Sequence, residues 1–189
     1  MLSLSMIVRD EATRIEACLR SVHDFVDEMV VVDTGSTDET VALAQACGAR
    51  VEHLTWPCDC APARNAALEH VKGDWVLVLD ADEQLRTEAI PKLKALMAQP
   101  DVLVINLLRH ELGAARAPYS NVSRLFRRHP RIQWSRPYHS LIDESVAALM
   151  SDEPQWRIAN CAEPALLHDG YRPELLSGTD KAERLRQSM

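Results

Sequence analysis

Short apolar runs and amphipathic helical patterns alternate along the first half of the chain. Strands are predicted over the apolar runs at residues 3–9, 29–33 and 75–79, and a further short strand over 49–54. The first helical pattern gathers four apolar side chains on one face: Ile15, Cys18, Leu19 and Val22. A second helical pattern covers residues 63–71 and is predicted to stop at Gly73. This alternation predicts an α/β fold, in which helices flank a mostly parallel sheet.

Carboxylates follow three of these predicted strands. Asp80 and Asp82 end the apolar segment WVLVLDADE, Asp33 ends the second run, and Asp10 and Glu11 follow the first. Ligands of parallel sheets bind outside the carboxyl ends of the strands, so we expect these acids to converge there. Two hard oxygen donors suit a divalent cation that takes its remaining ligands from substrate phosphates. The alternative is a solvated turn that happens to be acidic.

The second half of the chain carries a weaker pattern. Strands are predicted over residues 102–108 and 121–126, with a loop over 111–120 that could cover a site. Five arginines lie close together, at positions 124, 127, 128, 131 and 136. They could draw an anionic donor or acceptor toward the cleft, but most of them are expected to belong to a solvated strand pair. A helix over residues 140–150 would place His139 and Asp143 on one face.

Composition excludes several classes of protein. The chain has 189 residues, 28 acidic against 21 basic, and a net charge of −7, which argues against binding to nucleic acid. No apolar run reaches the length of a membrane span, and the N-terminus lacks the features of a signal peptide. The five cysteines are odd in number and irregularly spaced, so we expect no disulfide framework. Cys18 and Cys47 are predicted core residues, and Cys58 and Cys60 are predicted loop residues rather than metal ligands. We expect a cytoplasmic protein, with peripheral attachment to a membrane left open.

Four segments in order, SMIVRDE, VVDTGSTDET, APARNAALEHVKGDW and VLVLDADE, resemble the family 2 glycosyltransferases of GT-A fold. They cover roughly the first 85 residues and are specific as a set. Segments at 124–134 and 166–185 resemble a subgroup that often carries helical repeats downstream, and we expect no such repeats before Met189. The resemblance implies a single glycosyltransferase domain over 1–189 with a Rossmann-like sheet. Residues 1–85 would form its nucleotide-binding half and residues 86–189 its acceptor half.

The resemblance also implies a reaction, the transfer of a sugar from a nucleoside diphosphate sugar with inversion. A bound Mg²⁺ or Mn²⁺ would neutralise the diphosphate leaving group. Its implied protein ligands are Asp82 and His168. The implied nucleotide-binding residues are Glu11, Asp33, Arg64, Asn65 and Asp80. Asp80 would contact the ribose or the metal, and Lys181 and Arg184 are further candidates for the diphosphate.

Each of these implied roles has a structural alternative. Asp33 could accept the imide N–H of uracil, which favours a UDP-sugar. Guanine also offers N–H donors. The structural alternative for Asp33 is a helix-capping or turn role. Glu11 could serve only the dipole of the following helix. Arg64 could pair with Glu69 on the surface, and His168 could be an ordinary core or surface histidine.

The resemblance leaves three candidates for the catalytic base. An inverting transfer needs a base for the acceptor hydroxyl, and relatives place a His-Glu pair near Tyr138-His139-Ser140. Ser140 replaces that Glu here, so the candidate bases are Asp143, then Glu144, then His139. The acceptor could be a saccharide, a lipid-linked sugar or a protein side chain.

Two functions other than sugar transfer are compatible with parts of this pattern. A degenerate protein would bind the donor without turnover, and loss of the base would explain it. A phosphotransferase of the haloacid dehalogenase type also uses Asp-x-Asp, but places the pair after its first strand. Here the pair follows the fourth predicted strand, which disfavours that family.

Overall fold

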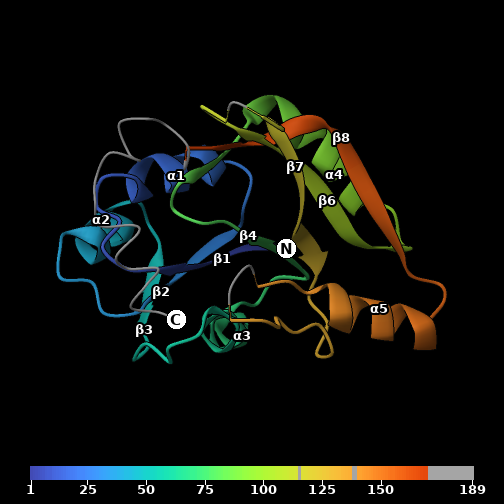
Figure 1. Ribbon diagram of the computed structural model, residues 1–189, viewed down its shortest axis with the longest axis horizontal. Helices are drawn as coiled ribbons and strands as arrows, with labels where there is room; N and C mark the ends of the chain where they lie inside the picture. The colour runs from blue at the N-terminus through green and yellow to red at the C-terminus, as the bar shows by residue number, and fades with distance from the viewer. Residues whose placement is uncertain (115, 138–139, 170–189) are drawn as a thin grey trace.

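The computed structural model describes residues 1–114, 116–137 and 140–169 (Figure 1). Its strands are β1 (Leu2–Val8), β2 (Glu28–Asp33), β3 (Arg50–His53), β4 (Trp75–Val78), β5 (Glu83–Leu85), β6 (Val102–Glu111), β7 (Tyr119–Arg127) and β8 (Arg157–His168). Its helices are α1 (Ile15–Val22), α2 (Thr40–Ala46), α3 (Cys60–His70), the short 3-10 helix η1 (Thr87–Ala89), α4 (Ile90–Met97) and α5 (Asp143–Asp152). None of the helices in this part of the chain is long and apolar enough to span a membrane.

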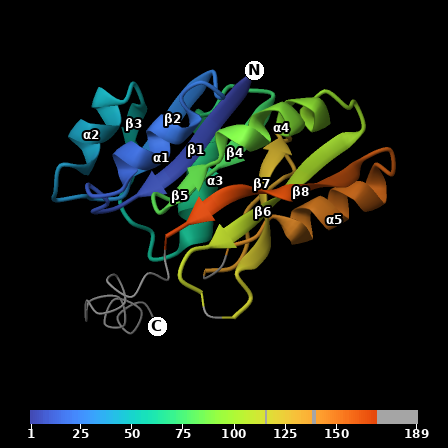
Figure 2. The same cartoon turned by 90° about the horizontal axis from the view of Figure 1, so that it is seen from above.

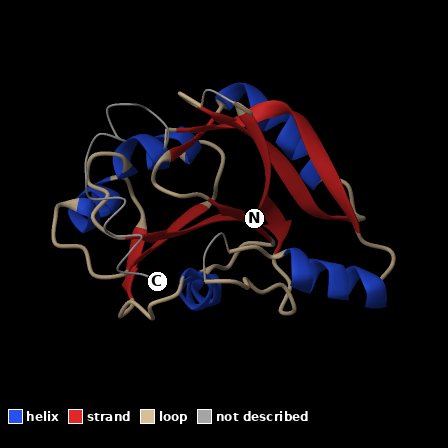
Figure 3. Cartoon of the chain, in the orientation of Figure 1, coloured by secondary structure: helices blue, strands red, loops and turns tan. Residues whose placement is uncertain are grey.

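All the strands belong to one sheet, in the order β3-β2-β1-β4-β7-β6-β8-β5 (Figure 3). The strands β3, β2, β1 and β4 are parallel, as the sequence predicts. Beyond β4 the sheet is mixed, because β7 runs antiparallel to both β4 and β6, and β5 runs antiparallel to β8. The sequence predicted the parallel strands and also β6 and β7, but it did not predict β5, β8 or the antiparallel pairings.

Helices cover the two faces of this sheet in separate layers (Figures 1 and 2). The helices α1, α2 and α4 pack on one face through an apolar cluster that includes Leu19 and Leu93. The helices α3 and α5 pack on the other face through a second cluster that includes Ala67 and Val146. The four apolar residues of the predicted first helix are all buried, so that prediction is confirmed.

The sheet curls, so that β5, the last strand in the sheet order, comes back close enough to β4 for a short segment to join them. In the sheet order β5 lies four places from β4, which would be about 19 Å in a flat sheet. Only residues 79–82 join the two strands, and they form a turn in which the Glu83 N–H donates to the Asp80 carbonyl over 2.9 Å. The turn that carries Asp80 and Asp82 therefore closes the seam of the curled sheet.

Three local predictions need correction. Helix α5 begins at Asp143, not at residue 140, so the proposed shared helical face of His139 and Asp143 is wrong, and His139 itself lies outside the described residues. The strands β6 and β7 extend to Glu111 and from Tyr119, which shortens the predicted loop. Cys60 opens helix α3 rather than lying in a loop, since the Asp59 carboxylate caps that helix by accepting the Ala61 N–H over 2.8 Å.

Gly73 has a packing role and not the predicted helix-stop role. Helix α3 already ends at His70. A β-carbon on Gly73 would lie 2.5 Å from the Ser3 hydroxyl and 2.8 Å from the Ser3 amide nitrogen. Only glycine allows this close approach of the chain to β1, and the Gly73 N–H uses it to donate to the Ser3 hydroxyl over 2.7 Å. The contact fixes the entry of the chain into β4, and so into the acidic turn.

Candidate active site

The turns after β1 and β2 are tied to each other by side chains. The Asp10 carboxylate accepts the Thr37 N–H over 2.7 Å, and the Thr40 hydroxyl accepts the Glu11 N–H over 2.8 Å. Asp10 has a φ of 53°, a left-handed conformation that a short polar residue tolerates better than most. These contacts give one rim of the sheet a fixed shape before any ligand binds.

Strand register places Asp33 on the same rim as the acidic turn after β4. Asp33 lies opposite Val8 of β1, and Ser5 of β1 lies opposite Val78 of β4. Val8, the partner of Asp33, lies three positions beyond Ser5 on β1. Residue 81 likewise lies three positions beyond Val78, the partner of Ser5. Asp33 and the Asp80–Asp82 turn therefore lie at the same height along the strand direction. They are separated by two strand spacings, about 10 Å. The predicted convergence of these carboxylates on one edge is therefore present.

Asp80 lies between two arginines. One carboxylate oxygen accepts from Arg64 Nη2 over 2.6 Å, and the other accepts from Arg124 Nη2 over 2.7 Å. Burial alone would raise the pKa of Asp80, but the positive charges of Arg124 and Arg64 outweigh it and hold the pKa far below its usual range. Arg64 therefore pairs with Asp80, not with Glu69 on the surface.

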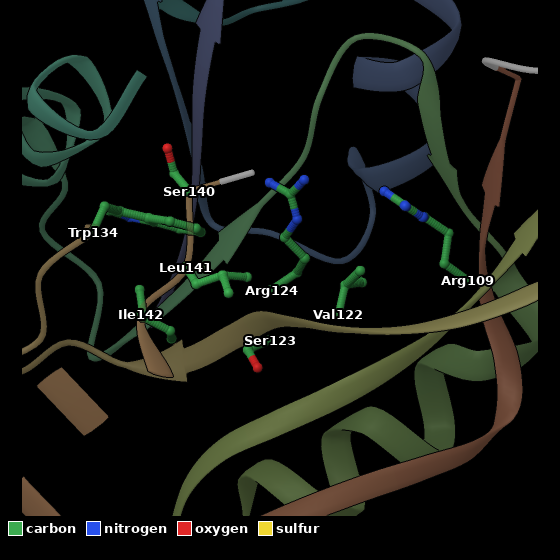
Figure 4. Close-up of a pocket in the computed structure, with 8 residues that line it drawn as sticks. All are labelled: Arg109, Val122, Ser123, Arg124, Trp134, Ser140, Leu141 and Ile142. Carbon is green, nitrogen blue, oxygen red and sulfur yellow. The ribbon is translucent and has the colours of Figure 1, made fainter. Parts of the chain in front are cut away.

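A β-bulge in β7 lies at Arg124, the residue that donates to Asp80. In the β6–β7 pairing Ile105 lies opposite Leu125 and Asn106 lies opposite Ser123, so Arg124 has no opposite residue. Figure 4 shows that Arg124 and Val122 point to one side of β7 and Ser123 to the other, which keeps the ordinary alternation of a strand. Bulges of this kind recur beside active sites.

The ionic contacts continue from Asp80 across the curled sheet. Arg124 Nη2 lies 3.8 Å from the fully buried Glu83 carboxylate, and Glu83 also pairs with Arg109 Nη1 over 2.7 Å. Arg109 Nε pairs in turn with Glu111 over 2.8 Å. Glu111 contacts His168 Nδ1, and the last pair in the series joins His168 to Asp82. We call this series of eight side chains the ionic chain: Arg64, Asp80, Arg124, Glu83, Arg109, Glu111, His168 and Asp82.

Asp82 and His168 have a separation that suits a shared metal ion. His168 Nε2 lies 3.2 Å from Asp82 Oδ2, and two adjacent ligands of an octahedral Mg²⁺, each about 2.1 Å away, lie about 3.0 Å apart. Burial raises the pKa of Asp82, but its hydrogen bond to His168 and the charge of that ring lower it overall, which keeps the carboxylate ionised. The described residues contain no cluster of three or more His, Cys, Asp and Glu arranged for a metal. A Mg²⁺ ion held by this pair would take its other ligands from phosphate oxygens and water, as it usually does in proteins.

Three buried N–H groups around Trp134 have no hydrogen-bond partner among the described residues. They are Arg64 Nη1, Arg124 Nη1 and Trp134 Nε1. The guanidinium carbons of Arg64 and Arg124 lie 4.9 and 5.9 Å from the centre of the Trp134 ring. An unmade buried hydrogen bond costs about 1–3 kcal/mol, so these donors favour a ligand that brings acceptor oxygens.

Asn65 holds this tryptophan in place. Its amide oxygen accepts the Trp134 N–H over 2.7 Å, and its amide nitrogen donates to the Trp134 carbonyl over 3.0 Å. Both polar atoms of Asn65 are therefore engaged with the backbone of Trp134. The side chain acts on the site through Trp134, and we do not assign it the predicted direct contact with a nucleotide.

The remaining nucleotide candidates lie at the rim. The Asp33 carboxylate accepts the backbone N–H groups of Gly35 and Ser36 over 3.1 Å each, so it organises its own turn while facing the shared edge. Burial raises the pKa of Glu11, and the charges of Asp82 and Asp80 add to that rise. Glu11 is therefore within electrostatic reach of the acidic turn.

The candidate bases lie less favourably than the metal pair. The Asp143 carboxylate contacts the Ser123 hydroxyl over 3.2 Å, on the side of β7 that faces away from Arg124. Glu144 pairs with Arg136 over 2.9 Å, and hydrogen bonding from Arg136 lowers the pKa of Glu144, which weakens it as a base. His139, Lys181 and Arg184 lie outside the described residues.

A small hollow adjoins the ionic chain on the acceptor side. It has a volume of about 120 Å³, and Arg109, Arg124, Trp134 and Ser140 are among its lining residues (Figure 4). The hollow is too small for a whole sugar nucleotide, since pockets for drug-sized ligands span about 300–1,000 Å³. It can take one polar group of a larger ligand that lies along the rim.

Comparison with known proteins decides the family. Residues 3–158 match the family described as Glycosyl transferase family 2. The chain belongs to glycosyltransferase family 2. A TPR repeat-containing protein of Synechococcus elongatus is 49% identical over 187 residues, which are 99% of this chain and 46% of that protein. An uncharacterized glycosyltransferase of Rickettsia bellii is 34% identical over 134 residues, which are 66% of this chain and 45% of that protein. The name of the first relative agrees with the predicted subgroup, because TPR units are helical repeats.

Solved structures of family 2 glycosyltransferases share the fold. Staphylococcus aureus TarS in complex with UDP-GlcNAc has a TM-score of 0.72 at 18% identity, over 99% of this chain and 65% of that one. Glucosyl-3-phosphoglycerate synthase of Mycobacterium tuberculosis in complex with Mg²⁺ and UDP has a TM-score of 0.69 at 18% identity, over 100% of this chain and 79% of that one. The fold is therefore GT-A, as predicted. The chain spans less than half the length of the two curated relatives described above.

Several residues of the ionic chain were missed by sequence reasoning. Arg124 was predicted only as one member of a basic cluster, most of which was expected to be solvated, and Glu83, Arg109 and Glu111 were given no role. A usable signal was present in LLRHE, since Arg109 and Glu111 lie two positions apart on a strand and so share a face. The bulge at Arg124 has no comparable signal, because it depends on pairing with a distant strand.

Proposed function

We propose that the chain is the donor-binding and catalytic domain of a metal-dependent, inverting glycosyltransferase that uses a UDP-sugar. The observation that carries this proposal is the approach of His168 Nε2 to Asp82 Oδ2 at 3.2 Å on the ligand-binding rim of the sheet. The pair would hold Mg²⁺ or Mn²⁺, which stabilises the departing diphosphate as a Lewis acid. Asp33 would accept from the nucleobase at the same rim.

The buried donors around Trp134 support an oxygen-rich ligand at this rim. Arg64 and Arg124 each keep one N–H group for it, and hydrogen bonds from a cation to phosphate are stronger than those between neutral groups. The neighbouring structures are complexes of TarS with UDP-GlcNAc and of glucosyl-3-phosphoglycerate synthase with Mg²⁺ and UDP. Their shared fold supports the same classes of ligand here.

Nucleotide and metal are expected to stabilise the chain together. A thermal-shift screen would test UDP, GDP and ADP, each with and without Mn²⁺. A ligand that binds only the folded state at a hundred times its dissociation constant adds about 2.7 kcal/mol, which is a rise of about 5–10 °C for a chain of this size. We expect that rise for UDP with Mn²⁺, and a much smaller one for UDP with EDTA. An equal rise for all three nucleotides, or one that EDTA does not reduce, would contradict the proposal.

A second candidate is a domain that binds the donor but does not turn it over. The contact of Asp143, the first-ranked base, with Ser123 favours it, because Ser123 points to the side of β7 away from Arg124 (Figure 4). Release of UDP from a UDP-sugar, with water or acceptor present, separates the two candidates. Binding without release would support the second. The acceptor (a saccharide, a lipid-linked sugar or a protein side chain) and the cytoplasmic or peripheral membrane location remain predictions.

A further inference from the structure

Three neighbouring strands bring His168 between two acidic side chains. In the sheet His168 of β8 lies opposite Glu83 of β5 on one side and Glu111 of β6 on the other. The ring uses both nitrogens, since Nε2 faces Asp82 at 3.2 Å and Nδ1 contacts Glu111 Oε2. The second contact comes from the acceptor half of the chain and is not needed to bring Nε2 to Asp82.

The Glu111 carboxylate is itself held from several directions. Its Oε1 accepts from Arg109 Nε over 2.8 Å and from the Ser120 hydroxyl. Its backbone N–H donates to the Pro118 carbonyl over 2.8 Å. The side chain is only 7% exposed, so it has little room to swing away from His168. The contact between Glu111 and the imidazole is therefore part of a fixed frame.

We propose that Glu111 is a positioning residue for the metal site. It accepts the Nδ1–H of His168, so that Nε2, beside Asp82, is the nitrogen that would give up its proton and offer its lone pair to a divalent cation. A neutral imidazole has one N–H and one lone pair, and the partner of the first nitrogen decides which tautomer is present. Carboxylates that orient metal-bound histidines in this way raise metal affinity by about 10–100-fold. The inference rests on the proposed metal role of Asp82 and His168.

A purely structural role is the competing explanation. Glu111 also pairs with Arg109, so a substitution could act only by loosening β6. The tautomer of His168 distinguishes the two, because loosening alone does not predict which nitrogen carries the proton. Nitrogen NMR of the wild-type chain with diamagnetic Mg²⁺ and UDP should show the proton on Nδ1. A proton on Nε2 would overturn the proposal without the use of any variant.

Glu111→Gln is the sharpest substitution. Arg109 and Ser120 both donate to Oε1, so the amide oxygen should occupy that place and the amide NH₂ should face Nδ1. A donor at that point favours the tautomer with the proton on Nε2, which blocks the metal. We expect Mn²⁺ affinity, measured by titration calorimetry, to fall about 10–100-fold. The matched control is Glu88→Gln, because the Glu88 side chain on η1 is 76% exposed. The Glu88→Gln variant should bind Mn²⁺ with the affinity of the wild type.

A double-substitution cycle separates this inference from the proposed function. In a His168→Ala background, Glu111→Gln should cause no further loss of Mn²⁺ affinity, since Glu111 acts through the ring that is gone. An equal loss of Mn²⁺ affinity in both backgrounds would overturn the positioning role while leaving the metal site intact. Wild-type Mn²⁺ affinity in the Glu111→Gln single variant would also overturn the positioning role. A wild-type chain that binds no Mn²⁺, even with UDP present, would instead overturn the proposed function and the inference together.

Discussion

Replacement of Asp82 by alanine is expected to reduce the release of UDP from a UDP-sugar by about a thousandfold. The reason is the loss of the metal that stabilises the diphosphate as it leaves, a contribution of several kcal/mol. Each 1.36 kcal/mol of barrier is a factor of ten in rate, so about 4 kcal/mol corresponds to a thousandfold. The measurement is the initial rate of UDP formation at saturating Mn²⁺.

Metal removal gives this prediction its internal check. EDTA should lower the wild-type rate to that of Asp82→Ala and leave the variant unchanged, because both treatments remove the same ion. Asp24→Ala is the matched control, since the Asp24 side chain is 98% exposed and pairs with His23 away from the ionic chain. An Asp82→Ala chain that keeps a rate dependent on Mn²⁺ would show that other residues hold the metal.

Replacement of Arg124 by methionine is expected to destabilise the fold by about 2 kcal/mol. Removal of one partner from a fully buried ion pair costs about 3–5 kcal/mol. The cost should be smaller here, since the Asp80 side chain is 35% exposed and keeps Arg64 as a partner. For a chain of this length the melting temperature should fall by about 4–8 °C. Chemical denaturation of the metal-free chain measures the free energy of unfolding directly.

The control for Arg124 is Arg20→Met. Arg20 makes an i,i+4 pair with Glu16 on helix α1, with 74% of its side chain exposed, so its loss should change stability by less than about 0.5 kcal/mol. A cycle with Asp80→Asn tests the pair itself, because the two substitutions together should cost less than their sum. Strictly additive costs would contradict the ion pair described here.

The parallel half of the fold follows from local sequence. Three of its strands, β1, β2 and β4, are short apolar runs, and the helix between the first two has a clear apolar face, so the period of the pattern identifies these elements. The convergence of Asp33 with the Asp80–Asp82 turn follows from parallel topology alone, since strand ends of one direction share an edge. For these residues the sequence and elementary geometry were sufficient.

The mixed half depends on pairings between distant segments. The curl that brings β5 close to β4, and the bulge at Arg124, arise only when β7, β6 and β8 are in register. Helix α5 begins at Asp143 and not earlier, and no side-chain cap marks its start, so the sequence had no signal for that boundary. The ionic chain joins residues up to 86 positions apart, and no local pattern encodes it.

The central claim is that Asp82 and His168 hold a divalent ion against the diphosphate of a nucleotide. Pulsed electron spin resonance of the Mn²⁺-loaded chain with UDP tests it most directly, because the method detects nuclei within bonding distance of the metal. The account predicts coupling of the Mn²⁺ spin to one imidazole nitrogen and to phosphorus, with the nitrogen coupling lost in His168→Ala. Phosphorus coupling without any nitrogen coupling in the wild-type chain, or nitrogen coupling that survives His168→Ala, would contradict it.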